Sequence, residues 1–221
     1  MVNRAPLIAS LALVAGMAAV SAAVWTQIPD AARLPIHWDI NGVPNGYAPK
    51  AVALLVAPVL ALLLTLLLAG LASIRSTASR DALDSAAWRV GWIGSVLLLA
   101  IAHAIVILTA RGVRLDVAGN VTFAAALLLI ALGNFLGKVR ANPWLGIRTP
   151  WTRTSTYSWE KTNRRGGRLL VAVGLATLGT IAVFGVVPAV YVLMAGSAAT
   201  ALVTSVASYR YWKRDPDRAI S

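Results

Sequence analysis

The chain has 221 residues, of which 58% are hydrophobic and 13% are charged, and its mean hydropathy is +0.73. This composition excludes an ordinary soluble domain, and the absence of cysteine excludes disulfides, thiolate catalysis and cysteine-based metal sites. The net charge of +12 also occurs in nucleic-acid-binding proteins, so the placement of the basic residues decides whether that class applies.

Six apolar runs have about the length that a helix needs to cross a bilayer. They lie at 6–25, 51–72, 90–109, 121–137, 169–187 and 189–208. The sequence therefore predicts an all-α polytopic membrane protein with six transmembrane helices in the lipid bilayer. Only the Val187-Pro188 region separates the last two runs, which predicts a tight helical hairpin.

The basic residues are distributed unevenly among the predicted loops. If the amino terminus is cytoplasmic, only Arg33, Lys50, Arg111 and Arg114 of the 20 Lys and Arg residues lie outside. The positive-inside rule accounts for this asymmetry. We therefore expect a multi-pass membrane protein with both termini inside, and no direct binding of nucleic acid.

The first run imitates a signal peptide, because Arg4 precedes an apolar stretch and the small residues Ser21-Ala22-Ala23. We expect a retained helix, since cleavage would leave five spans and upset the charge asymmetry. The loop 26–50 that follows holds four of the ten prolines and the turn signals Asn41-Gly42 and Asn45-Gly46. Polar residues alternate with Ile36, Trp38 and Ile40, which predicts a short extended segment ending in a tight turn.

Two spans carry small or polar residues. His103 lies in the third span, and we interpret it as a hydrogen-bonded residue of the helix bundle, with a functional role as the alternative. In the fourth, Gly133 and Gly137 flank Asn134, and small residues at this spacing allow helices to approach closely. They permit a homo-oligomer or packing within one chain.

Residues 138–168 form the largest inner loop, which contains NPWLGIRTPWT at 142–152. Asn142-Pro143 is expected to end the fourth helix, and Gly146 and Pro150 predict a non-helical middle. A short amphipathic helix over 155–165 is expected to end at Gly166-Gly167. Four aromatic residues suit the headgroup zone: Trp144, Trp151, Tyr157 and Trp159.

Arg148 is the central charge of this loop, and its Pro and Trp neighbours suggest a fixed side chain. Glu160 is the only acidic residue between Asp116 and Asp215, so it is the candidate partner for a bidentate ion pair. The alternative is that Arg148 binds lipid phosphate or caps the end of the fourth helix.

Three stretches resemble the SdpI family of bacterial membrane proteins: LGIRTPWT…SWEKTNRRGGRLL (145–170), LPIHWDINGVPNGYAPK (34–50) and ASYRYWKRD (207–215). The amino-terminal half resembles the DUF1648 membrane module, with its L-P-x-x-H-x-x-x-x-G loop. The resemblance implies a module of residues 1–75, with two transmembrane helices, and an SdpI-like four-helix module of residues 76–221.

The family resemblance implies immunity to a secreted hydrophobic killing peptide, with possible signalling through a repressor held at the membrane. It implies no catalytic residue, cofactor or metal. The inner signature falls on Gly146, Arg148, Thr149, Pro150, Trp151, Trp159 and Asn163, to which Glu160 is added as the candidate partner of Arg148. The outer one falls on Pro35, His37, Gly42, Gly46 and Lys50, where Trp38 and Tyr47 add surface for a peptide.

Three other functions remain open. A transporter typically has charged or broken helices in mid-membrane, and here only His103, Asn134, Pro58 and scattered glycines qualify. A membrane enzyme needs a cluster of titratable groups, but spans two to six hold no carboxylate in their apolar cores, and neither HExxH nor GxSxG occurs. A general role in envelope homeostasis is the third alternative.

Overall fold

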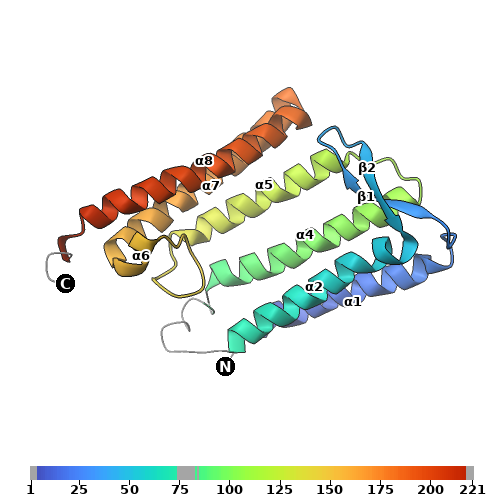
Figure 1. The fold of residues 1–221 in the computed structure, drawn as a ribbon, viewed down its shortest axis with the longest axis horizontal. Helices are drawn as coiled ribbons and strands as arrows, with labels where there is room; N and C mark the ends of the chain where they lie inside the picture. Colours follow the sequence, from blue (N-terminus) through green and yellow to red (C-terminus); the bar gives the residue numbers. More distant parts are fainter. Residues whose placement is uncertain (1–3, 74–82, 84, 218–221) are drawn as a thin grey trace. The chain divides into compact units, whose positions relative to one another are not determined.

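A computed structural model describes residues 4–73, 83 and 85–217, and these residues confirm the all-α polytopic fold (Figure 1). Six of its helices are long and apolar enough to cross a membrane. They are α1 (Ala5–Trp25), α2 (Lys50–Ser73), α4 (Ala86–Ala110), α5 (Val117–Leu136), α7 (Thr156–Phe184) and α8 (Val186–Lys213). The chain forms two compact units, Met1–Ile74 with Trp92–Ala124 and Arg75–Gly91 with Ala125–Ser221. The predicted modules 1–75 and 76–221 stay a prediction.

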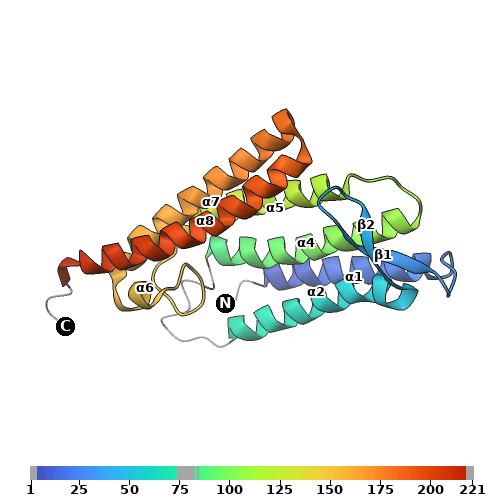
Figure 2. The same cartoon turned by 45° about the horizontal axis from the view of Figure 1, so that its top comes forward.

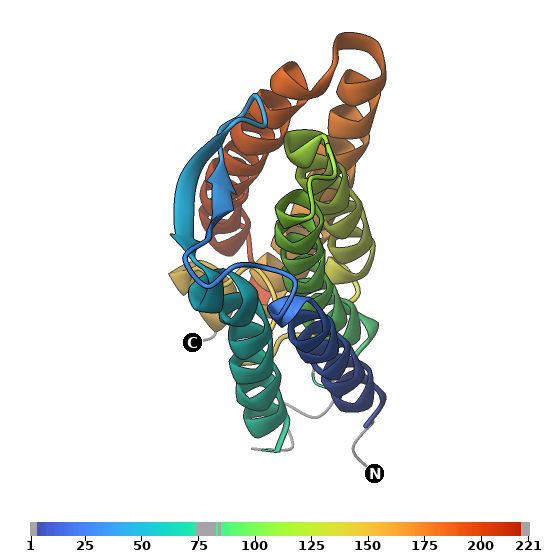
Figure 3. The same cartoon turned by 90° about the vertical axis from the view of Figure 1, so that its right-hand side faces the viewer.

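In the first unit, a β-hairpin lies at the ends of α1 and α2 (Figure 3). Its strands β1 (Arg33–Trp38) and β2 (Pro44–Pro49) pair antiparallel, which confirms the predicted extended segment. Apolar residues of the hairpin, α1, α2 and α4 share one buried core. These are Val24, Ile28, Leu34, Ala48, Ala53, Leu54, Val106 and Ile107. This core fixes the hairpin to the helix ends.

In the second unit, α7 and α8 form the predicted helical hairpin and lie side by side in both views (Figures 1 and 2). The expected break at Val187-Pro188 was wrong. The break is at Gly185, whose φ of 86° suits glycine. Pro188 lies in the first turn of α8, where its missing N–H costs no helical hydrogen bond.

Three expectations about the segment 138–168 were also wrong. Gly166-Gly167 does not end a helix, because α7 continues through both glycines to Phe184. Both are buried, and a Cβ on Gly167 would lie 2.5 Å from the Gly133 carbonyl oxygen of α5. These glycines therefore serve close helix packing. A non-helical chain was expected at Pro150, but this residue begins a short helix, α6 (Pro150–Thr154). The fourth helix was expected to end at Asn142-Pro143, but α5 ends earlier, at Leu136.

Candidate functional site

The outer hairpin turn is organised by Asp39. Its carboxylate accepts hydrogen bonds from the backbone N–H groups of Asn41 and Val43, both at 2.9 Å, and the Val43 bond holds the Asp39 pKa below its ordinary value. Gly42 has a φ of 77°, which glycine adopts without strain. The Asn41-Gly42 turn predicted from the sequence is therefore confirmed.

His37 lies across the hairpin from Gly46. Its Nδ1 is 2.5 Å from the Asn45 side-chain oxygen, and a Cβ on Gly46 would stand 3.0 Å from the His37 Cβ. The missing side chain at Gly46 therefore leaves the room that His37 occupies. Among the described residues, no group of three His, Cys, Asp or Glu side chains is placed to hold a metal ion.

Lys50 was expected on the peptide-facing surface, but its side chain is buried. The ammonium group donates to the carbonyl oxygens of Trp25 at 2.9 Å and Ile28 at 3.0 Å, and to the Asp30 carboxylate at 2.5 Å. It also lies 4.8 Å from the Trp25 ring centre. Lys50 thus ties the start of α2 to the end of α1 and has a structural role in the first unit.

The accessible surface of the hairpin is apolar. Val43 is 56% exposed and Tyr47 is 50% exposed, and Ile36 and Ile40 are exposed beside them. Trp38 is only partly accessible because it packs against the buried core. Tyr47 and the turn therefore offer a peptide more contact area than Trp38 does.

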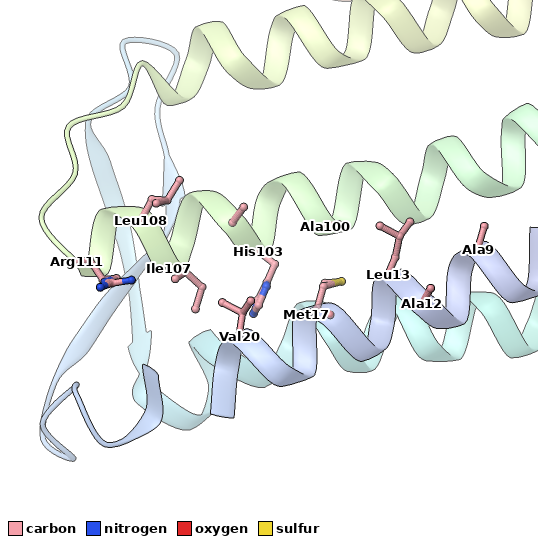
Figure 4. Close-up of a pocket in the computed structure, with 12 residues that line it drawn as sticks. Ala9, Ala12, Leu13, Met17, Val20, Ala100, His103, Ile107, Leu108 and Arg111 are labelled. Carbon is pink, nitrogen blue, oxygen red and sulfur yellow. The ribbon is translucent and has the colours of Figure 1, made fainter. Parts of the chain in front are cut away.

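An apolar groove of about 780 Å³ lies between α1 and α4 in the same unit (Figure 4). Small residues of α1 and α4 widen it, among them Ala12, Gly16 and Ala104. Met17 and His103 lie in its middle, and Arg111 lies at the end of α4 near the hairpin. Its volume is in the range of pockets that hold small ligands.

His103 bonds the three helices of this unit together, as interpreted from the sequence. Its Nε2 is 2.8 Å from the Ser21 hydroxyl oxygen, and that hydroxyl donates to the Leu54 carbonyl, also at 2.8 Å. Because Ser21 has one hydroxyl proton and gives it to Leu54, the Nε2 of His103 is the donor to Ser21. A neutral His103 then carries an unprotonated Nδ1, which can accept a hydrogen bond.

The inner signature builds a turn around the buried Trp159. Gly146, with a φ of 131°, packs so closely that a Cβ there would lie 2.8 Å from the Trp159 ring. The Trp159 indole donates to the Val139 carbonyl at 2.9 Å. Asn163 accepts from the Ile147 N–H at 2.7 Å, so the two buried residues of α7 hold the turn from one face.

Thr149 and Pro150 start α6 and attach it to α8. Thr149 caps α6 through Thr152, and its hydroxyl donates to the Ser208 hydroxyl at 2.9 Å. The ring of Trp151 lies 5.2 Å from that of Tyr209 on α8. These signature residues therefore join α6, α7 and α8 into one inner platform.

The proposed Arg148–Glu160 ion pair is absent, since the ion pair found among the described residues is Lys50–Asp30. Arg148 and Glu160 are both exposed, so the candidate ion pair is not formed, and binding of lipid phosphate by Arg148 stays a prediction. Trp159 and Asn163 face the turn, and Glu160 follows Trp159 by one residue, which rotates it by about 100° away from that face. The platform therefore presents Arg148 as an exposed cation that forms no ion pair with the residues the structure describes.

Sequence reasoning missed Ser21, Ser208 and Asp215 as partners in these networks. Ser208 accepts from Thr149, its carbonyl accepts from Ser158 at 2.8 Å, and the Asp215 carboxylate accepts from the Ser155 hydroxyl. Of these three residues, only Ser21 has a signal in the sequence: Pro58 inside α2 leaves the Leu54 carbonyl without its helical N–H donor, so another donor is needed.

Comparison with known proteins gives two matches to family models. Residues 138–208 match the SdpI/YfhL protein family, and residues 12–62 match a domain of unknown function, DUF1648. The chain is 26% identical over 185 residues to the immunity protein SdpI of Bacillus subtilis (strain 168). The alignment covers 82% of this chain and 84% of that relative. No solved structure gives a significant match. The predicted resemblance is therefore confirmed: residues 12–62 are similar to the DUF1648 domain and residues 138–208 to the SdpI/YfhL family.

Proposed function

We propose that this chain is a non-enzymatic immunity protein of the bacterial cytoplasmic membrane, with both termini inside, that protects against a secreted hydrophobic peptide. The observation that carries the proposal is the similarity to an immunity protein along most of both chains. The apolar hairpin surface and the α1–α4 groove support it, since both suit a ligand that arrives through lipid.

The peptide first meets the exposed side chains of the hairpin, Val43 and Tyr47 above all. The Arg111 end of the groove lies at the same end of the unit, because Ile107 of α4 and Leu34 of the hairpin share the buried core. An apolar peptide can then pass from the hairpin into the groove without crossing water. The Nδ1 of His103, which this tautomer leaves unprotonated, supplies a hydrogen-bond acceptor in the middle of the groove for a peptide N–H.

The signalling part of the proposal concerns the inner platform. Arg148, Arg153 and Lys161 are exposed on it and form no ion pair among the described residues. Such a basic surface suits an acidic face of a cytoplasmic repressor, whose association would be weakened by salt. Peptide binding must then change the repressor's affinity, and the coupling is reciprocal.

The test is survival of a peptide-sensitive bacterium that expresses the chain while the family's killing peptide is titrated. Val43→Ser with Tyr47→Ser should abolish the protection given by wild type at equal membrane levels, because the changes remove the exposed apolar contacts. Val183→Ser with Tyr191→Ser is the matched control, since it changes exposed residues of the same types on α7 and α8.

Absence of protection by the wild-type chain contradicts the proposal for that peptide. A general envelope defect on deletion, without hypersensitivity to any peptide, favours envelope homeostasis. Uptake of a small solute or ion into proteoliposomes favours a transporter, the remaining alternative.

A further inference from the structure

A second groove, of about 500 Å³, lies between α7 and α8 near their ends at the inner platform. Its polar end is formed by Arg165 of α7, by Arg210 and Tyr211 of α8, and by Arg214, which directly follows α8. Its other end is formed by apolar residues of α8, including Leu202 and Val206. One groove therefore joins a strongly cationic end to an apolar end.

The sequence of α8 produces this arrangement directly. Leu202, Val206, Arg210 and Arg214 recur every fourth residue and so follow one another along one side of the helix. At 1.5 Å per residue, this stripe passes from apolar side chains to guanidinium groups over roughly 18 Å. The change from apolar to charged occurs between Val206 and Arg210.

Aromatic side chains mark the membrane surface at the same level of α8. The ring of Tyr209 lies 5.2 Å from Trp151 and stacks on Trp212 at 6.1 Å. Such rings collect at the headgroup level of a bilayer, where an apolar body and a polar edge are both accommodated. This level corresponds to headgroup depth for Arg210, and Leu202, eight residues earlier in α8, is then at the depth of the acyl chains.

The charge of the groove is not neutralised within the described chain. Arg165, Arg210 and Arg214 are exposed and form no ion pair among the described residues. The nearby Asp215 carboxylate accepts from the Ser155 hydroxyl and does not line the groove. The Tyr211 hydroxyl, 3.5 Å from a guanidinium nitrogen of Arg165, can also donate to an anion.

We propose that this groove is a binding site for an anionic phospholipid. The phosphate lies among the three arginines, whose planar forks bind phosphate oxygens through paired hydrogen bonds, and an acyl chain lies along Val206 and Leu202. A soluble acidic protein matches only the charged end, since the apolar end lies below the membrane surface. The site would anchor the α7–α8 hairpin at the inner platform whether or not the chain confers immunity.

The experiment adds phosphatidylglycerol to the full-length chain in detergent and counts bound lipid by native mass spectrometry. The test variant carries Arg165→Gln, Arg210→Gln and Arg214→Gln. Its affinity should fall about 100-fold, because each basic residue near an anionic lipid contributes roughly a five-fold factor. Phosphatidylcholine should bind wild type more weakly, because its headgroup has no net charge.

A control variant carries Arg153→Gln, Lys161→Gln and Lys213→Gln, which removes the same charge from exposed residues that do not line the groove. It should retain phosphatidylglycerol within about five-fold of wild type, since its changes leave the groove intact. Equal losses in both variants would show diffuse attraction and overturn the site. Unchanged binding by the test variant would also overturn it, as would equal affinity for inorganic phosphate, which has no acyl chain.

Discussion

The Ser21 hydroxyl of α1 donates to the Leu54 carbonyl of α2 at 2.8 Å, and Pro58 explains why that carbonyl is available. Proline has no N–H, so the carbonyl four residues earlier in the helix loses its helical donor. Inside a membrane no water replaces that donor, which makes the Ser21 bond a structural requirement of α2. The same hydroxyl oxygen accepts from His103, so one serine connects three helices.

Ser21→Ala should destabilise the chain by about 1–2 kcal/mol, because it leaves the Leu54 carbonyl and the His103 Nε2–H without partners. Pro58→Ala supplies an N–H to Leu54, so Ser21→Ala should cost less in that background. The measurement is the free energy of unfolding in mixed detergent for both single variants and the double variant.

Thr180→Ala is the control for this cycle. The Thr180 hydroxyl bonds to the Ala176 carbonyl of its own helix and is partly exposed, so its loss should be small. If Ser21→Ala cost the same with and without Pro58, the link between the proline and the serine would be disproved.

The Lys50–Asp30 pair predicts a dependence of stability on pH. The hydrogen bond from Lys50, and then its positive charge, hold the pKa of Asp30 below its ordinary value of 3.8. A carboxyl group whose folded-state pKa is lowered contributes stability above its unfolded pKa, and that contribution is lost as the pH falls through the folded pKa.

Asp30→Asn should therefore flatten the acid-side decrease in unfolding temperature, measured in detergent from about pH 7 down to pH 3. Asp217→Asn is the control, since Asp217 is exposed and forms no ion pair among the described residues. Identical pH curves for wild type and Asp30→Asn would show that this pair has no measurable role.

The transmembrane spans could be predicted because the length of an apolar run indicates a membrane helix without any knowledge of its tertiary contacts. The hairpin turn was equally local, since Asn41-Gly42 carries its own conformational preference. Gly166-Gly167 was misinterpreted for the opposite reason. A glycine pair that ends a helix and one that packs against another helix have the same letters, and only the position of Gly133 separates them.

The candidate site was predicted as a set of residues more accurately than as a set of contacts. Most of the inner signature does lie together around Trp159. The Arg148–Glu160 ion pair was suggested by nearness in sequence alone. It is absent because Glu160 points to a different side of α7 from Trp159 and Asn163, which contact the turn. Lys50 was assigned to the peptide-facing surface because the family signature of the outer loop includes it. Its three acceptors come from residues that only the fold brings together.

Gly167→Ala should destabilise the second unit by about 1–3 kcal/mol, because the added methyl group would meet the Gly133 backbone carbonyl at 2.5 Å and backbone cannot yield cheaply. Gly179→Ala in the same helix has nothing within 4 Å of its new methyl group and should be neutral or slightly stabilising. The measurement is unfolding in mixed detergent. Equal effects of the two substitutions would show that helix propensity, not the close contact with α5, governs both glycines.

Substitutions of Gly146 and Arg148, two residues apart in the inner signature, should affect different properties: the first stability, the second peptide resistance. Gly146→Ala combines a φ of 131° with a contact at 2.8 Å to the Trp159 ring, so it should lower stability by about 2 kcal/mol or more. Arg148→Ala removes an exposed side chain without an ion pair and should change stability by less than about 0.5 kcal/mol. If the platform acts through this charge, Arg148→Ala should abolish peptide resistance at equal membrane levels although the protein stays folded. Arg148→Lys, which keeps the charge but not the planar fork, distinguishes simple attraction from bidentate recognition. Full resistance in Arg148→Ala would limit the role of the signature to folding.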